Sequence, residues 1–587
     1  MASEAQPLLF HKAPHGASSS TRSRNAKGRS LARWVSGFAL FAVTHTITHY
    51  FLGLYLDHPH RRELTYSGEK ISWKPCGTVS DHDLECSTIS VPMDHFNTSN
   101  NANGQSFSIP LLRMRGKNAT RNILLNPGGP GGSGAEFIYR RGAQLSHIIG
   151  EGFHLLGFDP RGVNESRPIA SCYPDSDARR ALSPIQAKKI IEDSGSLWAW
   201  ANNYAHACSD TMGEYASHIN TPQTAADMNT ILDAIGQEDM YYWGFSYGTL
   251  LGQTYATLFP ERSKRVAIDG VVNQFDWYEQ PLDQEELVDT EKVFAGFVDE
   301  CVKAGPDKCA LASLAETKSQ LSERLISSIA KLRDEPLPVY INNTVYGALD
   351  QWSVWYDGVF SALYRPALWS KLASNLASFL GGNATDAFLA YSWGPEKWNE
   401  SSDPLYFVLA NDGAAGPKHW PRDRTSMVSL LQPFFNQSMF GDGALDLYFI
   451  KATWSIPRKH SYVPRHGVKT AHPLLILSTT YDPVCPLLSA RSANHEFEGS
   501  RIVEVKGYGH CSVAVPSMCA ARRIREFFYE GKLPSENVQC EVDGEPYFEK
   551  PDESGRVAVL AHFDDPEEQK IHLAQVELAR DLWLRPW

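Results

Sequence analysis

Short apolar segments alternate with helical stretches along most of this chain, and the alternation restricts the fold more than any other feature. From Asn122 onward the segments read NILLN, HLLGF, YYWGF and RVAIDGVV, and after a long gap PLLILSTTYD and RIVEVKGYGH. Such runs, separated by helices, are typical of a parallel sheet with helices on both faces. Before Asn122, alternating polar and apolar residues favour antiparallel leading strands. The sequence therefore predicts an α/β fold with a mostly parallel sheet.

The long gap divides the predicted core. Residues 284–456 are helix-like and rich in Trp, with no convincing buried strand, and we expect them to form a helical cap. The core would then have two parts, residues 60–283 and 457–550, followed by a C-terminal extension over residues 551–587. At 587 residues the chain exceeds the size at which one core stops growing, so an insertion of this size is reasonable.

The N-terminal residues predict a membrane anchor. Residues 1–33 contain six Lys and Arg against one Glu and are rich in Ser, Gly and Ala, as in a basic disordered cytoplasmic tail. Residues 34–56 contain no Asp, Glu, Lys or Arg and are long enough for one transmembrane helix. The basic flank predicts a single-pass type II protein that contacts the membrane through this helix, with a lumenal or extracellular body. The alternative is a signal peptide, whose cleavage would release a secreted protein.

Sequons and cysteines agree with a lumenal or extracellular body. The ten cysteines form sequence-local couples without CxxC spacing, so we expect disulfides between neighbours, with the connectivity left open. The net charge of −12 argues against nucleic acid as a partner. The seven candidate N-glycosylation sites all follow the predicted anchor; they are Asn97, Asn118, Asn164, Asn342, Asn383, Asn399 and Asn436.

A G-x-S-x-G pentapeptide at residues 244–248 predicts a nucleophile. Ser246 lies between the apolar run YYWGF and a helical stretch, where a sharp strand-to-helix turn would expose its hydroxyl. Asp482 ends PLLILSTTYD and His510 ends RIVEVKGYGH. Each alone would be an ordinary turn residue, but together they follow the order Ser, acid, His of α/β-hydrolases. The sequence therefore predicts a Ser246–Asp482–His510 triad.

Two cysteines lie next to the predicted triad, Cys485 three residues after Asp482 and Cys511 directly after His510. A disulfide between them would hold the two loops together. Two buried thiols are the equal alternative.

The glycine-rich loop NPGGPGGSG at residues 126–134 has two possible roles. It matches G-x-G-x-x-G, the spacing of a dinucleotide-binding turn, and Asp159 lies near the position of a ribose-binding acid. Pro130, however, removes one N–H, and a dinucleotide site leaves the predicted triad unexplained. In an α/β-hydrolase the same loop supplies one backbone donor of the oxyanion hole, and the residue after the nucleophile supplies the other. We expect these donors to be Gly129 and Tyr247.

Several motifs resemble those of the tripeptidyl-aminopeptidase and prolyl-aminopeptidase-like α/β-hydrolases of peptidase family S33. They include NPGGPGGSG, GFDPRGVNES, GFSYGTLLGQTYATLFPERSKRVAIDG, DPVCP and GYGHCS, and the resemblance spans about residues 70–545. It implies the same triad and an exopeptidase that acts on peptides with a free N-terminus, with the cap limiting substrate length. An acid of the cap would pair with the substrate's α-ammonium, and the candidates are Asp357, Glu396 and Asp412.

The resulting expectation is a serine hydrolase with an α/β-hydrolase fold and a helical cap. The triad acts on any activated carbonyl, so an esterase, a lactonase or an acyl-transfer-type hydrolase is the alternative, and a non-enzymatic binding protein is disfavoured. The substrate would be a peptide or a small acyl compound. No cofactor or metal is expected, and the oligomeric state is left open.

Overall fold

A mixed sheet organises the protein, as given by a computed structural model that describes residues 63–97, 104–182, 190–393, 402–548 and 563–581. Within these ranges eleven strands pair in the order β1-β2-β3-β4-β6-β5-β7-β8-β11-β12-β13. The first four strands are antiparallel, and the sheet becomes parallel beyond the antiparallel β4–β6 pair. The antiparallel strands are β1 (Leu64–Thr65), β2 (Ser72–Val79), β3 (His82–Pro92) and β4 (Ser106–Met114). The others are β5 (Asn122–Asn126), β6 (His154–Phe158), β7 (Met240–Phe245), β8 (Ser263–Asp269), β11 (Leu475–Tyr481), β12 (Arg501–Tyr508) and β13 (Val538–Cys540).

Each face of the sheet carries its own hydrophobic core. Successive side chains of a strand point to opposite faces, so Ile123 and Leu125 of β5 join one cluster and Leu124 joins the other. The first cluster is covered by α2 (Gly134–Ile149), α17 (Met518–Glu530) and α18 (Pro566–Asp581). The second is covered by α5 (Thr221–Ala234), α6 (Tyr247–Leu258) and α16 (Leu487–Glu496). The predicted sheet between two helical layers is confirmed.

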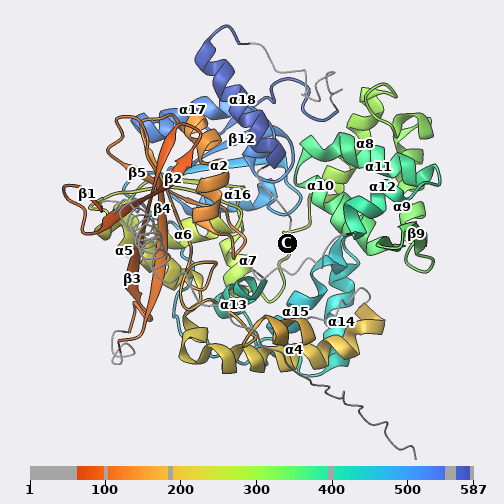
Figure 1. Cartoon of the computed structure of the whole chain (residues 1–587), viewed down its shortest axis with the longest axis horizontal. Helices are drawn as coiled ribbons and strands as arrows, with labels where there is room; N and C mark the ends of the chain where they lie inside the picture. Colours follow the sequence, from red (N-terminus) through yellow and green to blue (C-terminus); the bar gives the residue numbers. More distant parts are fainter. Residues whose placement is uncertain (1–62, 98–103, 183–189, 394–401, 549–562, 582–587) are drawn as a thin grey trace, which may run out of the picture. The chain divides into compact units, whose positions relative to one another are not determined.

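The cap contains two groups of elements (Figure 1). In one group, α8 (Thr290–Ala304), α9 (Lys318–Lys331) and α11 (Trp369–Leu380) share a third hydrophobic core with a hairpin. Its strands are β9 (Leu337–Asn342) and β10 (Val345–Leu349). Only helices were expected here. Most hairpin side chains are exposed, so its residues lack the apolar run of a buried strand.

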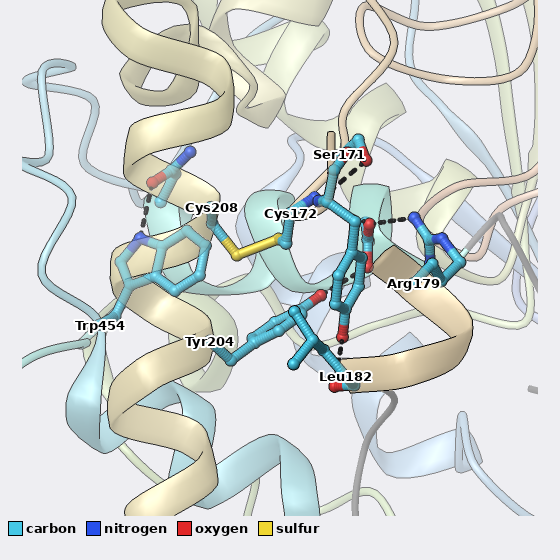
Figure 2. The surroundings of a disulfide bond; sticks show 10 residues. Ser171, Cys172, Arg179, Leu182, Tyr204, Cys208 and Trp454 are labelled. Carbon is cyan, nitrogen blue, oxygen red and sulfur yellow. Dashed lines mark hydrogen bonds and ion pairs between the residues drawn. A yellow bond between two sulfur atoms is a disulfide. The ribbon is translucent and has the colours of Figure 1, made fainter. Parts of the chain in front are cut away.

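The second group includes a helix that comes from before the predicted cap. The helices α14 (Arg424–Phe435) and α15 (Leu445–Thr453) pack against α4 (Ile190–Met212), which lies in the range assigned to the core. Figure 2 shows the Cys172–Cys208 disulfide that joins α4 to the preceding loop. Beside it, the carboxylate of Asp403 in α13 (Ser402–Asp412) accepts hydrogen bonds from the Cys172 amide at 2.9 Å and the Tyr204 hydroxyl at 2.6 Å.

Neighbouring cysteines are bonded as expected, apart from Cys485 and Cys511. All ten cysteines lie in the described ranges, and eight form the disulfides Cys76–Cys86, Cys172–Cys208, Cys301–Cys309 and Cys519–Cys540. Of the seven sequon asparagines, Asn399 lies outside the described ranges, and the other six are exposed. Their glycosylation stays a prediction.

The expected tail and membrane anchor, residues 1–33 and 34–56, lie outside the described ranges. Among the residues that are described, no helix is both long and apolar enough to cross a membrane. The C-terminal extension contributes α18, whose buried Ile571 and Leu578 join the core beside α2.

Candidate active site

Ser246 occupies the sharp turn between β7 and α6. Its backbone has φ 55° and ψ −127°, a sparsely populated positive-φ conformation that costs a residue with a side chain about 1–3 kcal/mol. A Cβ on Gly244 would lie 2.3 Å from the Gly248 carbonyl oxygen, and one on Gly248 would lie 2.7 Å from the Asn126 carbonyl oxygen. Strand and helix therefore approach too closely for side chains, which is the steric reason for both glycines of the motif.

Asp482 and His510 meet beside this turn, one from the end of β11 and the other from the end of β12. Both are buried, and His510 Nδ1 lies 2.9 Å from Asp482 Oδ1 and 3.0 Å from Oδ2. The same carboxylate accepts backbone hydrogen bonds from Val484, Cys485 and Cys511 at 3.0, 2.9 and 2.8 Å. These donors fix the carboxylate, so it can orient an imidazole that carries its proton on Nδ1.

A second buried carboxylate, Asp269 at the end of β8, links the nucleophile turn to the histidine loop. Its carbonyl oxygen accepts from the Ser246 amide at 3.0 Å. Its side chain accepts from the Ser512 amide at 2.6 Å and the Ser512 hydroxyl at 2.7 Å. Burial raises its pKa to about 6 despite these donors. The sequence analysis missed Asp269, although it ends an apolar run as Asp482 does.

The glycine-rich loop lies against the nucleophile turn. A Cβ on Gly128 would lie 2.9 Å from Ser246 Cβ and 3.0 Å from the Tyr247 nitrogen. The Gly128 amide donates to Asn126 Oδ1 at 2.9 Å, and Pro130 has no N–H, so Gly129 carries the amide that this turn can offer to an oxyanion. Tyr247 begins α6, and the positive end of the helix dipole favours negative charge there. The assignment of Gly129 and Tyr247 as donors stays a prediction.

The other residues of the loop have a packing role. A Cβ on Gly134 would lie 2.3 Å from the Phe158 carbonyl oxygen, so this glycine allows α2 to cross β6. Both oxygens of Asp159 are occupied: one accepts from Ser133 Oγ at 2.5 Å, and the other accepts from Asn164 Nδ2 at 2.9 Å. Asp159 therefore fixes the start of α2, and neither of its oxygens is left for a ribose.

The possible disulfide beside the triad is not formed. Cys485 and Cys511 are both buried and free. The Cys511 thiol lies 3.2 Å from the Asp269 carbonyl oxygen, and the Cys485 side chain contacts the Ser246 hydroxyl. Each thiol contacts a group other than the neighbouring cysteine. Proximity of the two loops is therefore not sufficient for a disulfide.

The three candidate acids for substrate binding have different surroundings. Asp357 lines the cavity next to the site, and Glu396 lies outside the described ranges. Asp412 is fully buried and accepts from Thr221 Oγ1 at 2.5 Å and from Trp277 Nε1 at 2.9 Å. Thr221 Oγ1 also lies 2.6 Å from the Tyr247 hydroxyl. Asp412 therefore supports Tyr247, the residue after Ser246, through the Thr221 hydroxyl.

A cavity of about 440 Å³ extends from the site into the cap. It reaches the site at Gly129 and at Tyr364, whose ring centroid lies 5.0 Å from that of His510. Its wall contains Trp and Tyr side chains and five acidic residues, but Lys451 is the only Lys or Arg among the residues that line it. The acidic residues are Asp276, Asp283, Glu286, Asp357 and Asp446.

Three of these acids and Lys451 form an electrostatically coupled group. Burial, together with Asp283 and Glu285, raises the pKa of Asp276 to about 6. Burial and Asp283 raise the pKa of Glu286 to about 8. Burial lowers the pKa of Lys451 to about 8 although Asp283 and Glu286 oppose the shift. The sequence analysis missed the group because DQEELVD reads as a solvated acidic stretch and Lys451 follows more than 160 residues later.

The fold and this site define a serine hydrolase of the α/β-hydrolase class. A family model described as "alpha/beta hydrolase fold" matches residues 121–305, and one described as "TAP-like protein" matches residues 437–540. The chain is similar to a tripeptidyl aminopeptidase of Streptomyces lividans, with 27% identity over 81% of this chain and 87% of the relative. The resemblance to the tripeptidyl-aminopeptidase-like hydrolases is thus confirmed.

Two further relatives differ in the activity that their names state. The serine protease Hip1 of Mycobacterium tuberculosis is 26% identical over 81% of this chain and 91% of its own length. Carboxylesterase B of the same species is 25% identical over 80% of this chain and 89% of its own length. The protein is therefore a hydrolase with peptidase relatives, and an esterase is among its similar proteins.

Proposed function

We propose that the protein is an exopeptidase that releases amino acids or short peptides from free N-termini. His510 removes the proton of Ser246, whose oxygen attacks the scissile carbonyl, and Asp482 keeps the imidazole oriented. The N–H groups of Gly129 and Tyr247 stabilise the oxyanion. His510 then protonates the leaving amine, and water hydrolyses the acyl-enzyme.

The observation that carries the proposal is one carboxylate oxygen of an acid in the cavity wall. Asp276 Oδ2 is buried, and within the described part of the chain it has no hydrogen-bond partner. A buried acceptor without a donor costs about 1–3 kcal/mol, so a ligand that donates a hydrogen bond there is favoured. The α-ammonium group of a peptide supplies both the donor and the opposite charge.

Asp283 and Glu286 strengthen the preference for a cation. The pKa of Glu286, raised to about 8, places a protonated carboxyl in the wall at neutral pH. An ammonium group nearby favours the ionised form of such a carboxyl. Binding of a free N-terminus would therefore be coupled to proton release, whereas an N-acetylated peptide would offer no compensating charge.

Esterase activity is the second candidate. A carboxylesterase is among the relatives, and aromatic side chains such as Trp352 and Phe360 line the same cavity. An apolar acyl chain could occupy that part of the wall without contacting the acids. A lactonase or acyl-transfer reaction would use the same triad.

The N-terminal residues support a further part of the proposal, namely that residues 34–56 anchor the protein and leave the hydrolase domain lumenal or extracellular. The basic flank of this segment and the exposed sequon asparagines favour this arrangement over an uncleaved soluble form. Secretion after signal cleavage is the alternative.

Activity of the full-length protein on matched substrates tests the proposal. Aminoacyl, dipeptidyl and tripeptidyl amides, each with a free and an acetylated N-terminus, should be compared with simple esters. We expect cleavage of the free amides, and Ser246→Ala should abolish it. Turnover of esters alone would refute the exopeptidase, and activity that survives in Ser246→Ala would refute the mechanism.

The acid group is tested by the double variant Asp283→Asn/Glu286→Gln. Its KM for free N-termini should rise more than its KM for esters. Asp446→Asn is the matched control, because Asp446 lines the same cavity but its carboxylate accepts from the Tyr406 hydroxyl at 2.6 Å. If the double variant and the control change the KM values of free and acetylated substrates equally, the acids do not take part in substrate recognition.

A further inference from the structure

Three different metal-ligating side chains converge beside the nucleophile. Asp482, Cys485 and His510 each offer one ligand atom, and these three atoms lie within 4.8 Å of one another. All three residues are buried, and two of them belong to the predicted triad. The third, Cys485, has no part in the proposed hydrolysis.

Cys485 is held at this position by the same loop that carries Asp482. Its amide donates to Asp482 Oδ1 at 2.9 Å, which turns the chain back over the carboxylate. Its side chain contacts the Ser246 hydroxyl, so the sulfur faces the reacting atoms.

The donor set matches the preferences of zinc. Zn²⁺ binds Cys sulfur at about 2.3 Å, His nitrogen at about 2.0–2.1 Å and carboxylate oxygen at about 2.0–2.2 Å, with tetrahedral geometry. Ligand atoms around such an ion are about 3.3–3.8 Å apart, so a contraction of about 1 Å would close the site. The thiolate selects soft and borderline cations over Mg²⁺ and Ca²⁺, which prefer oxygen.

We propose that Asp482, Cys485 and His510 form an inhibitory site for a thiophilic divalent cation such as Zn²⁺. On binding, the Cys485 thiol loses its proton to solvent and the thiolate bonds to the metal, so the cluster exchanges one proton for one cation. His510 Nδ1 is the ring nitrogen that faces Asp482, so the metal binds Nδ1 and the ring proton moves to Nε2. The Nε2 electron pair that His510 uses as general base is thereby lost, and positive charge is placed next to Ser246. The inhibition rests on the proposed roles of Ser246 and His510, whereas the binding itself does not.

The experiment separates binding from inhibition. Full-length protein, stripped with a chelator, is titrated with ZnCl₂ by calorimetry and with CoCl₂ by absorption, where a thiolate ligand gives a sulfur-to-metal charge-transfer band. Labelling of Ser246 by a fluorophosphonate probe, with and without Zn²⁺, reports the reactivity of the nucleophile without a known substrate. The variants are Cys485→Ser and Cys511→Ser. Cys511 is the matched control because it is also a buried thiol beside Asp482 but lies outside the cluster.

The expected result is a site lost only with Cys485. Zinc affinity should fall in Cys485→Ser by at least about the tenfold that changes around metal ligands typically cost. The charge-transfer band should disappear in that variant, and Zn²⁺ should slow its labelling much less. Cys511→Ser should keep the zinc affinity, the charge-transfer band and the ratio of labelling rates with and without Zn²⁺.

Two results would overturn the proposal. Equal zinc affinity in Cys485→Ser, or a cobalt complex without a thiolate band, would refute the site itself. Zinc that binds through Cys485 but leaves labelling unchanged would refute the inhibition and, with it, the proposed role of His510. Near-ultraviolet circular dichroism of each variant distinguishes lost ligation from lost folding.

Discussion

Gly128→Ala tests the contact between the glycine-rich loop and the nucleophile turn. The new Cβ would lie 2.4 Å from the Phe245 carbonyl oxygen, whereas ordinary non-bonded contacts between heavy atoms are about 3.5–4.0 Å. The loop would have to retreat by about 1 Å. Gly128 also has φ 95°, and a side chain in that region costs about 1–3 kcal/mol.

The retreat moves Gly129, which is adjacent in the chain and is a predicted oxyanion donor. A displacement of about 1 Å at a reacting centre can cost about 100-fold in rate, and loss of one oxyanion donor costs about 100- to 1,000-fold in kcat. We therefore expect kcat to fall by about two orders of magnitude, with a smaller change in KM. The assay is steady-state hydrolysis of the best substrate, with thermal unfolding measured in parallel.

The control for Gly128→Ala is Gly467→Ala. Gly467 has φ 62°, but nothing lies within 4 Å of its added Cβ, so this change introduces only the backbone strain. It should lower Tm without affecting kcat. If folded Gly128→Ala keeps kcat within about threefold of the unmodified protein, the loop does not supply a donor and the oxyanion-hole assignment is wrong.

Three further changes test other parts of the structure. The pKa of Glu286 is raised from 4.5 to about 8, so the folded protein retains a proton that the unfolded chain loses, and stability falls as pH rises through this window. Glu286→Gln should therefore raise Tm near pH 8 and have little effect near pH 4.5; the opposite trend would contradict the raised pKa. Thr221→Val removes the hydroxyl between Asp412 and Tyr247 and should lower the free energy of unfolding by about 1–3 kcal/mol in urea denaturation. An unchanged urea midpoint would show that this contact is not structural. Cys172→Ser opens a disulfide with a sequence separation of 36 and should cost about 4 kcal/mol by the same measurement, while Cys485→Ser, which breaks no disulfide, should cost less.

The sequence predicts the sheet well, and the same physical signal marks the residues of the predicted triad. Strands buried on both faces are continuous apolar runs, and Ser246, Asp482 and His510 each stand at the end of such a run. Parallel strands place their carboxyl ends at one edge of the sheet, which brings residues together across more than 230 positions. Asp269 carries the same signal and could have been found in the same way.

The acid group in the cavity could not be predicted from periodicity. Asp283 and Glu286 lie in an irregular segment, and their burial depends on packing against α15, which contributes Lys451. The contact between α4 and the cap could not be predicted for a related reason. The amphipathic residues of α4 indicate a helix but not the surface that it covers, and that surface proves to be α14 and α15. Tertiary packing, not local preference, determines both features.

The cap also supports the histidine loop directly. The His510 amide donates to the Tyr364 carbonyl oxygen at 3.0 Å, and a Cβ on Gly509 would lie 2.7 Å from Pro366 Cδ. The chain that follows α10 (Ser361–Leu363) therefore lies on the backbone that positions the imidazole. Any movement of this segment away from the core would remove a hydrogen-bond acceptor from His510 while widening the cavity at Tyr364. Substrate entry and the position of the predicted general base thus depend on the same cap segment, which contains Tyr364 and Pro366, and changes there should alter KM and kcat together.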